Sequence, residues 1–222
     1  MTTAPSAPTR RTTAPRKRGD DTRAKIIDET VRCVVEEGYP AATAKHVADR
    51  AGVTWGVIQY HFGDRNGLLM AVVDEGVARL MESLSTADVG NKTMAQRIET
   101  VVDIAWDCYS SPTSMAAFEI LRATRGSLGD LSRRHLLDMN DAINGLGRLI
   151  SDNPADHEVV EVIWASLRGM VLVEMIMGER IEWQRERQTL VAMATHYLQV
   201  PVDQRPKPPA APGDRARPRS HR

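Results

Sequence analysis

Residues 44–62, AKHVADRAGVTWGVIQYHF, meet the packing requirements of two short helices that cross at a steep angle. Such a crossing needs a small residue where the helices touch, which is Ala48, and a turn residue that tolerates a positive φ, which is Gly52. Thr43 and Thr54 stand where the two helices need N-caps. The pattern also needs apolar residues that face inward, and these are Val47, Ala51, Val53, Ile58 and Phe62. The segment therefore predicts a helix-turn-helix.

The outer face of the second helix has side chains suited to a DNA groove. A helical hairpin buried in a bundle is the alternative, but it gives no reason for Trp55, Gln59 and Tyr60 to stand on an outer face. Glutamine pairs bidentately with adenine, and Trp55 and Val57 suit thymine methyl groups or sugars. Lys45 can reach a base edge or a phosphate. The candidate DNA-contacting residues are Thr43, Lys45, Thr54, Trp55, Gly56, Val57, Gln59, Tyr60, His61 and Arg65.

Contacts to phosphate position a protein on DNA without specifying sequence. We expect them from Tyr60, His61 and Arg65, and from the free N–H groups at the helix ends that follow Thr43 and Thr54.

Helical periodicity continues through the rest of the chain, with little strand signal. Glycine, proline and asparagine punctuate the pattern, as at Gly38 and at Asn153-Pro154. The sequence therefore predicts an all-α protein of about nine helices. Their expected ranges are about 20–37, 43–50, 54–61, 64–86, 92–110, 112–126, 128–151, 155–180 and 182–198.

Both ends of the chain are basic, although the formal net charge is zero. Residues 1–19 carry five Lys/Arg and no acid, and residues 201–222 carry six Lys/Arg against two Asp. Both ends are too poor in apolar residues to build a core, so we expect disordered tails. Each tail is either a solubilising segment or, at the N-terminus, an arm that contacts DNA. The expected domains are a DNA-binding domain over 20–67 and a helical body over 68–200.

The composition excludes several classes of protein. No run approaches the roughly 20 apolar residues of a membrane-spanning helix, and the N-terminus has no apolar signal region. Cys33 and Cys108 lie in apolar helical contexts and are expected to be free core residues of a cytoplasmic protein. No His-Glu-x-x-His, Gly-x-Ser-x-Gly or Cys-His arrangement occurs, and no two histidines share a helix face at ligand spacing. We therefore expect no enzyme, metal or cofactor.

Residues 20–73, above all GYPAATAKHVADRAGVTWGVIQYHFGDRNGLLMAVV, resemble the DNA-binding domain of the TetR/AcrR family of bacterial regulators. The resemblance implies a three-helix DNA-binding domain, a connecting helix and a body that dimerises and holds an effector. The family usually has a tyrosine that contacts phosphate where this chain has Gln59, so we expect this position to contact a base instead. Arg65 replaces a common lysine, and Lys45 falls where some members place a base-contacting arginine.

The charge of the expected DNA-binding domain is unusual for its task. From Asp20 to Gly67 there are eight acidic and six basic residues. Affinity for DNA would then depend on helix dipoles, on the local placement of bases and on the arginine-rich N-terminal tail.

Residues 155–198 have the apolar pattern of a subunit interface. The segment 155–180 is apolar nearly all round, and the resemblance implies that the last two helices pair with those of a second copy. A monomeric core is the alternative. A two-fold dimer places two recognition helices about 34–36 Å apart and requires an operator that is an inverted repeat.

The middle helices offer residues for an effector pocket. Aromatic residues at helical spacing are more often plain core, but together they permit an apolar pocket with polar anchors. The candidates are Trp106, Tyr109, Phe118, Arg122, Met139, Trp164 and Arg168. The expected function is a repressor that an unidentified small molecule releases from double-stranded operator DNA. The alternative is a helix-turn-helix scaffold that binds proteins without effector control.

Overall fold

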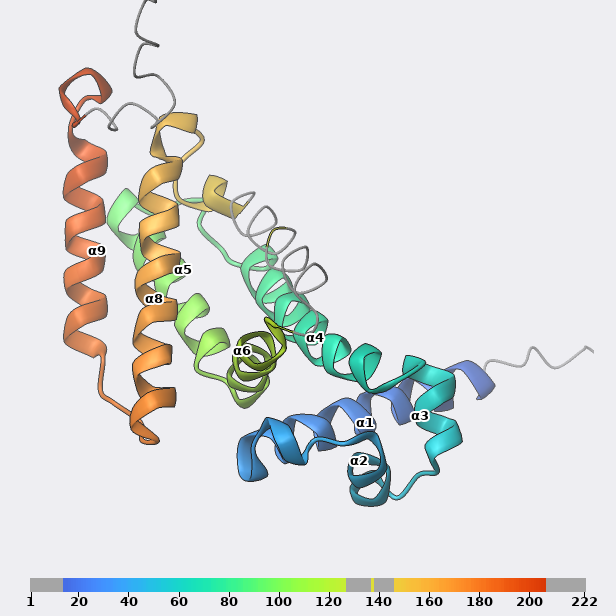
Figure 1. Ribbon diagram of the computed structural model, residues 1–222. Coiled ribbons are helices and arrows are strands. Elements are labelled where there is room, and N and C mark those ends of the chain that lie inside the picture. The colour runs from blue at the N-terminus through green and yellow to red at the C-terminus, as the bar shows by residue number, and fades with distance from the viewer. Residues whose placement is uncertain (1–13, 127–136, 138–145, 207–222) are drawn as a thin grey trace, which may run out of the picture.

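The computed structural model describes residues 14–126, 137 and 146–206, and within these ranges the chain forms eight α-helices and no strand (Figure 1). The all-α prediction is therefore confirmed. The helices are α1 (Ala14–Glu37), α2 (Ala44–Ala51), α3 (Trp55–Phe62), α4 (Arg65–Ser85), α5 (Met94–Tyr109), α6 (Pro112–Thr124), α8 (His157–Met177) and α9 (Gln184–Gln199). Four short 3-10 helices connect or flank them, at Tyr39–Ala41, Leu146–Leu149, Pro154–Asp156 and Val202–Gln204.

Two cores hold the helices together, and α4 contributes to both. Buried residues of α1, α2, α3 and α6 pack with the first half of α4, which includes Leu68 and Leu69. The second half of α4, with Leu80 and Leu84, packs with α5, α8 and α9. The expected domain boundary after residue 67 thus lies inside a helix that joins the N-terminal domain to the body (Figure 1).

Helix α1 begins earlier than the sequence predicted. It starts at Ala14 rather than Asp20, so residues 14–19 belong to a helix and not to a disordered tail. Pro15 is tolerated in a first helical turn, and the Arg-Lys-Arg run that follows consists of good helix formers. Residues 1–13 lie outside the described part of the chain.

The C-terminal boundary also differs from the prediction, because residues 201–205 are ordered against the body. The guanidinium of Arg205 is buried and pairs with Asp156 at 2.5 Å, and it donates to the backbone oxygens of Val200 and Leu198. This arginine closes the end of α9 onto the start of α8. The predicted helix over 128–151 falls mostly outside the described residues, and its end, at 146–149, is a 3-10 helix.

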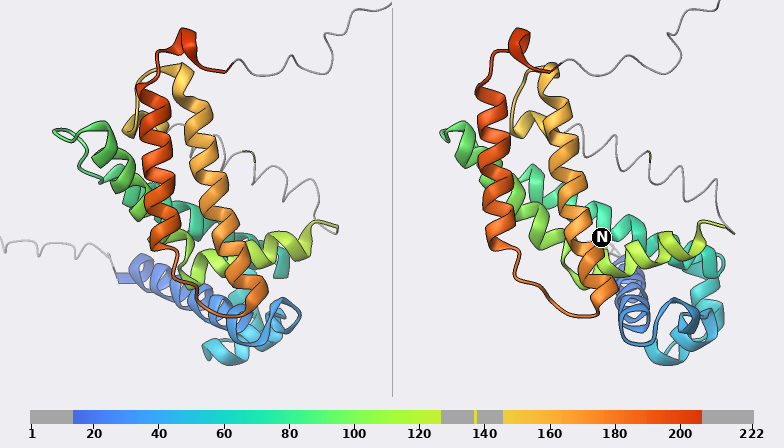
Figure 2. Two further views of the ribbon diagram at one scale, coloured as in Figure 1. Left: turned by 90° about the vertical axis from the view of Figure 1, so that its left-hand side faces the viewer. Right: turned by 60° about the vertical axis from the view of Figure 1, so that its left-hand side comes forward.

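Helices α8 and α9 lie side by side on one flank of the body in every view (Figure 2). Their outer faces expose apolar side chains: Val162, Leu172, Val173, Ile176 and Met177 on α8, and Met193 on α9. Within the described ranges, no helix is both long enough and apolar enough to span a membrane. Cys33 and Cys108 are free thiols, as predicted.

Candidate nucleic-acid interface

The turn between α2 and α3 has the geometry that the sequence predicted. Gly52 adopts a left-handed conformation with φ 64° and ψ 37°, which a side chain would strain. Its N–H caps α2 on the carbonyl oxygens of Ala48 and Asp49. Ala48 is 3% exposed, so the two helices meet over a methyl group. At the other end of α2, the hydroxyl of Thr43 accepts a hydrogen bond from the His46 N–H at 3.2 Å.

Helix α3 separates a buried face from an exposed one. Ile58 is fully buried in the domain core, whereas Gln59 and Gly56 are exposed. The indole of Trp55 is 46% exposed and the phenol of Tyr60 is 85% exposed, although both are large rings that normally find cover. The domain therefore presents aromatic and amide groups to solvent on one side of a short helix.

Thr54 occupies the N-cap position of α3, but its hydroxyl makes no capping hydrogen bond. The first backbone N–H groups of α3 therefore donate no hydrogen bond to the Thr54 side chain. Free N–H groups at a helix N-terminus attract anions through their donors and through the helix dipole. Thr43 and Lys45, at the start of α2, are likewise exposed.

Three predicted contact residues are partly withdrawn from this surface. Val57 is half-buried and packs against the domain core, and His61 is half-buried with its ring 5.0 Å from that of Tyr60. Arg65 departs furthest from the prediction of a phosphate clamp. Its guanidinium donates to the backbone oxygens of Ala42 (2.7 Å) and Tyr39 (3.1 Å) and stacks on the Tyr39 ring. It therefore fastens the 3-10 turn to α4, because those carbonyl oxygens need a donor.

Charge pairing reduces the number of bases that remain for DNA. Arg50 contacts Glu29, Glu36 and Glu37, all on α1, so its charge serves the α1–α2 contact. Arg23 lies over the Phe62 ring at 5.4 Å, which places this part of α1 beside the end of α3. Fewer guanidinium groups of the N-terminal domain are thus free to contact phosphate than its composition indicates.

The predicted effector residues separate into two groups in the body. Tyr109, Phe118 and Trp164 form one aromatic cluster, with ring centroids 5.8 Å and 6.3 Å from that of Tyr109. Burial raises the pKa of Tyr109 to about 12, and the positive charge of Arg168 opposes the rise. Tyr109 and Phe118 line a cavity of about 20 Å³ between α4, α5 and α6, which is the size of about one water molecule.

The other effector candidates lie elsewhere. Trp106 faces α9, where the Arg187 guanidinium lies 5.3 Å from its ring centroid, because the apolar stripe of α5 is shared between two neighbouring helices. Arg122 is exposed on α6. Neither residue lines the cavity beside Tyr109, so the predicted effector residues do not share one pocket, and a role of these two in effector binding stays a prediction. Met139 lies outside the described residues.

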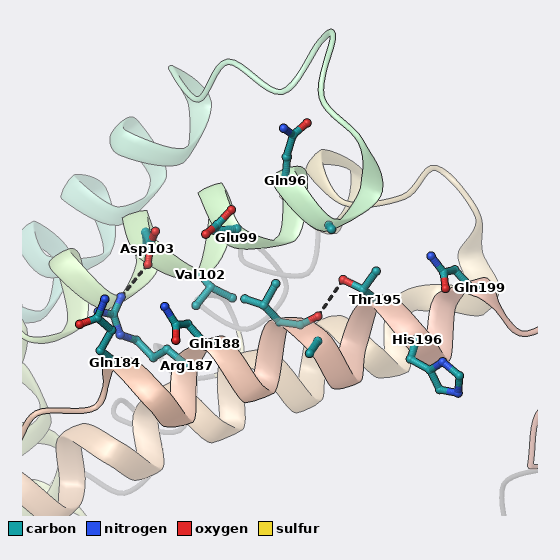
Figure 3. Close-up of a pocket in the computed structure, with 13 residues that line it drawn as sticks. Gln96, Glu99, Val102, Asp103, Gln184, Arg187, Gln188, Thr195, His196 and Gln199 are labelled. Atoms are coloured by element: carbon teal, nitrogen blue, oxygen red, sulfur yellow. Dashed lines mark hydrogen bonds and ion pairs between the residues drawn. The ribbon is translucent and has the colours of Figure 1, made fainter.

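A polar groove that the sequence did not indicate runs between α5 and α9 (Figure 3). Its volume is about 530 Å³, and Arg187 crosses it to pair with Asp103 at 2.6 Å. Its other polar lining residues include Gln96, Glu99, Gln188 and His196. The groove could not be predicted from the sequence, because its exposed polar residues lie on two helices about 80 positions apart.

The fold and the exposed face of α3 define an all-helical protein with an N-terminal helix-turn-helix domain. Residues 26–72 match the family model described as bacterial regulatory proteins, tetR family. The N-terminal domain of the chain is therefore similar to the DNA-binding domain of the tetR family.

Curated relatives resemble the N-terminal part of the chain. The HTH-type transcriptional regulator BetI of Burkholderia cenocepacia is 34% identical over 86 residues, which cover 38% of this chain and 44% of BetI. The HTH-type transcriptional repressor AcnR of Corynebacterium efficiens is 35% identical over 65 residues, which cover 29% of this chain and 35% of AcnR. The chain thus spans less than half the length of these curated relatives.

Solved structures share the fold over most of the chain. The fatty acid degradation regulator FadR from Bacillus halodurans superposes with a TM-score of 0.63 at 16% identity, over 77% of this chain and 96% of FadR. The multidrug binding protein EbrR, complexed with imidazole, gives a TM-score of 0.57 at 18% identity, over 84% of this chain and 97% of EbrR. At these identities the likeness concerns the fold alone.

Proposed function

We propose that the protein is a transcriptional repressor that binds an inverted-repeat operator and is released from it by a small molecule. The observation that carries the proposal is the division of α3, with Ile58 in the core and Trp55, Gln59 and Tyr60 toward solvent. A helix of this kind fits the major groove with its exposed face toward the bases. BetI and AcnR are a transcriptional regulator and a transcriptional repressor by name, which supports the proposal. Such a protein acts in the cytoplasm, where the bacterial chromosome lies.

Gln59 is the residue that we expect to read a base, because its amide can donate to and accept from adenine at once. The phosphate contacts come from Tyr60, from the N-terminal ends of α2 and α3, and from Lys45. The Arg-Lys-Arg run at 16–18 adds charge at the start of α1. This division lets a domain with few free bases bind a polyanion.

The exposed apolar face of α8 and α9 supports a homodimer. Val162 and Met193 are 57% and 65% exposed, and they line a groove of about 250 Å³ between the two helices. Apolar surface of this extent is costly in water, and a second copy of the same two helices covers it with a four-helix interface. A two-fold dimer then presents two copies of α3 to adjacent turns of the duplex.

Effector control requires a connection between the body and α3. Helix α4 is continuous between the two cores, and Glu119 of α6 bonds to Tyr39, on which Arg65 is stacked. An effector that shifts α4 or α6 would therefore change the angle between the two α3 helices of a dimer. The small cavity beside Tyr109 is enclosed by α4 as well as by α5 and α6, so we propose that effector entry widens it and shifts α4 at the expense of operator binding.

A gel-shift titration on the DNA segment upstream of the protein's own coding region tests the proposal. The wild-type protein should retard that fragment at concentrations at which random duplex of equal length stays free. Gln59→Ala is the informative variant, and Asn66→Ala, an exposed change at the start of α4, is its control. Equal retention of both fragments by the wild-type protein would contradict operator binding and support the protein-interaction alternative.

A further inference from the structure

Three side chains of the N-terminal domain bring potential metal ligands together between α1 and α2. Cys33 and Glu37 are one helical turn apart on α1, and His46 lies in the first turn of α2. The thiol sulfur, a carboxylate oxygen and an imidazole nitrogen all lie within 4.8 Å of one another. The imidazole Nε2 is already 2.9 Å from the Glu37 carboxylate. The cluster thus holds three different donor types at one point.

This donor set suits one class of ion. Zinc binds thiolate at about 2.3 Å and imidazole or carboxylate at about 2.0–2.2 Å, so its tetrahedral donors lie roughly 3.3–3.7 Å apart. The distances here need to change by about 1 Å, which rotations of the Glu37 and His46 side chains supply because both are at the surface. Magnesium and calcium prefer oxygen donors alone, so the thiol disfavours them.

The surroundings of the cluster are compatible with a cation. Arg50 pairs with the Oε1 atom of Glu37, whereas the His46 Nε2 lies 3.2 Å from Oε1 and 2.9 Å from Oε2, so Oε2 is the oxygen without an arginine partner. Arg50 then acts as an outer partner that orients the carboxylate. Glu36 and Glu29 also contact Arg50 and balance its charge. The site therefore lies beside three carboxylates and one guanidinium.

We propose that Cys33, Glu37 and His46 bind one zinc ion that ties α1 to α2. On binding, the thiol proton of Cys33 leaves to solvent, a zinc–sulfur bond forms, and water takes the fourth position. The sequence alone predicts no metal, because no two histidines share a helix face at ligand spacing. Here the donors come from two helices, and only the Cys33–Glu37 spacing of four residues is visible in the sequence.

The consequence lies in the helix-turn-helix itself. The backbone N–H of His46 is the donor to Thr43 at the N-cap of α2. A metal bond to the His46 side chain fixes this exposed end of α2 against α1. Zinc would then raise the thermal stability of the N-terminal domain, whether or not the protein binds an operator. Failure of one proposal is thus distinguishable from failure of the other.

Cobalt(II) is the probe, because it takes zinc sites and gives a near-ultraviolet charge-transfer band only when a thiolate is bound. The untagged, reduced, metal-free full chain is titrated with cobalt chloride and then with zinc chloride. The wild-type protein should develop the band with one cobalt per chain and lose it when zinc is added. Cys108→Ser, which removes the other thiol, should behave as the wild type does.

The variants of the three ligands decide the assignment. Cys33→Ser should abolish the band, and His46→Gln and Glu37→Gln should each weaken cobalt binding by about tenfold or more. Cys33 is fully buried, so circular dichroism is used to check that Cys33→Ser is folded. If that variant unfolds, cobalt binding by His46→Gln and Glu37→Gln decides whether the site exists. A wild-type protein without the band, a band that depends on Cys108, or unchanged binding in His46→Gln would each overturn the proposal.

Discussion

The carboxylate of Glu119 in α6 accepts a hydrogen bond from the backbone N–H of Tyr39 at 2.8 Å, although 80 residues separate them. Tyr39 in turn carries the Arg65 guanidinium on its ring, 4.6 Å from the centroid. Arg65 reaches the carbonyl oxygen of Ala42, just before α2. A short series of polar contacts therefore connects the body to the helix-turn-helix beside the continuous helix α4.

Removal of this carboxylate should loosen the N-terminal domain. In Glu119→Ala the Tyr39 N–H is deprived of a charged acceptor in a half-buried place, and we expect the free energy of unfolding to fall by about 1–3 kcal/mol. Glu119→Gln keeps an acceptor oxygen and should be destabilised clearly less. Urea unfolding of both variants measures the difference. Equal stability of wild type and Glu119→Ala would show that the hydrogen bond contributes nothing.

The basic first turns of α1 should control the salt dependence of DNA binding. Replacement of Arg16, Lys17 and Arg18 by alanine keeps the helix propensity of this segment and removes three charges. The slope of log K against log salt should become shallower by about 0.9 for each phosphate that these side chains neutralise in the wild-type complex. Fluorescence anisotropy at several salt concentrations gives the slope. If the slope stays the same, this run is only a solubilising segment.

A charge placed on the exposed apolar face of α8 and α9 should prevent the proposed homodimer from forming. Met193 is 65% exposed, so Met193→Asp leaves the chain's own core intact while it puts a carboxylate into the proposed interface. We expect sedimentation to show a monomer for this variant and a dimer for Met193→Leu. Operator affinity should be lower for the monomeric Met193→Asp variant than for the dimeric wild type. A dimer that persists in Met193→Asp would place the interface elsewhere.

Tyr109 should make stability sensitive to alkaline pH. Burial raises its pKa from the ordinary value of 10 to about 12, so between these values the unfolded chain releases the phenol proton and the folded chain keeps it. The stability contributed by the neutral phenol is thus complete below pH 10 and is lost as the pH rises through 12.

Tyr109→Phe removes this titration. The Tyr109 hydroxyl makes no hydrogen bond of good geometry among the described residues, so the variant should be as stable as the wild type at neutral pH or slightly more so. Above pH 10 it should be the more stable of the two. Urea midpoints at pH values from about 8 to about 12 compare them. A difference between the two proteins that does not change with pH would contradict the account.

The sequence predicted the helix-turn-helix in detail because its constraints are local. Ala48, Gly52 and Ile58 lie within eleven positions, and each one's role follows from helix geometry alone. The outward direction of Trp55, Gln59 and Tyr60 then follows from the inward direction of Ile58. The order of the remaining helices could also be predicted, since each carries its own apolar period and its own breaker.

Relations between distant helices could not be predicted in this way. Periodicity marks an apolar stripe on α5 but does not tell which neighbour each residue meets. The sequence therefore groups Trp106 with Tyr109, although Trp106 faces α9. The sequence predicts a phosphate contact for Arg65, because its partner Tyr39 lies 26 residues earlier, in a 3-10 turn without a sequence signal. Cys33 and His46 meet only once α1 and α2 are packed.

Selection of bound sequences from a random duplex library tests the central claim most directly, which is that the exposed face of α3 reads DNA. The wild-type chain should enrich an inverted repeat whose half-sites lie about one duplex turn apart. Gln59→Ala should retain the spacing and weaken the preference at one adenine of each half-site by roughly 5- to 150-fold, the equivalent of about 1–3 kcal/mol. Failure of the wild-type protein to enrich any sequence over the starting library would contradict the account.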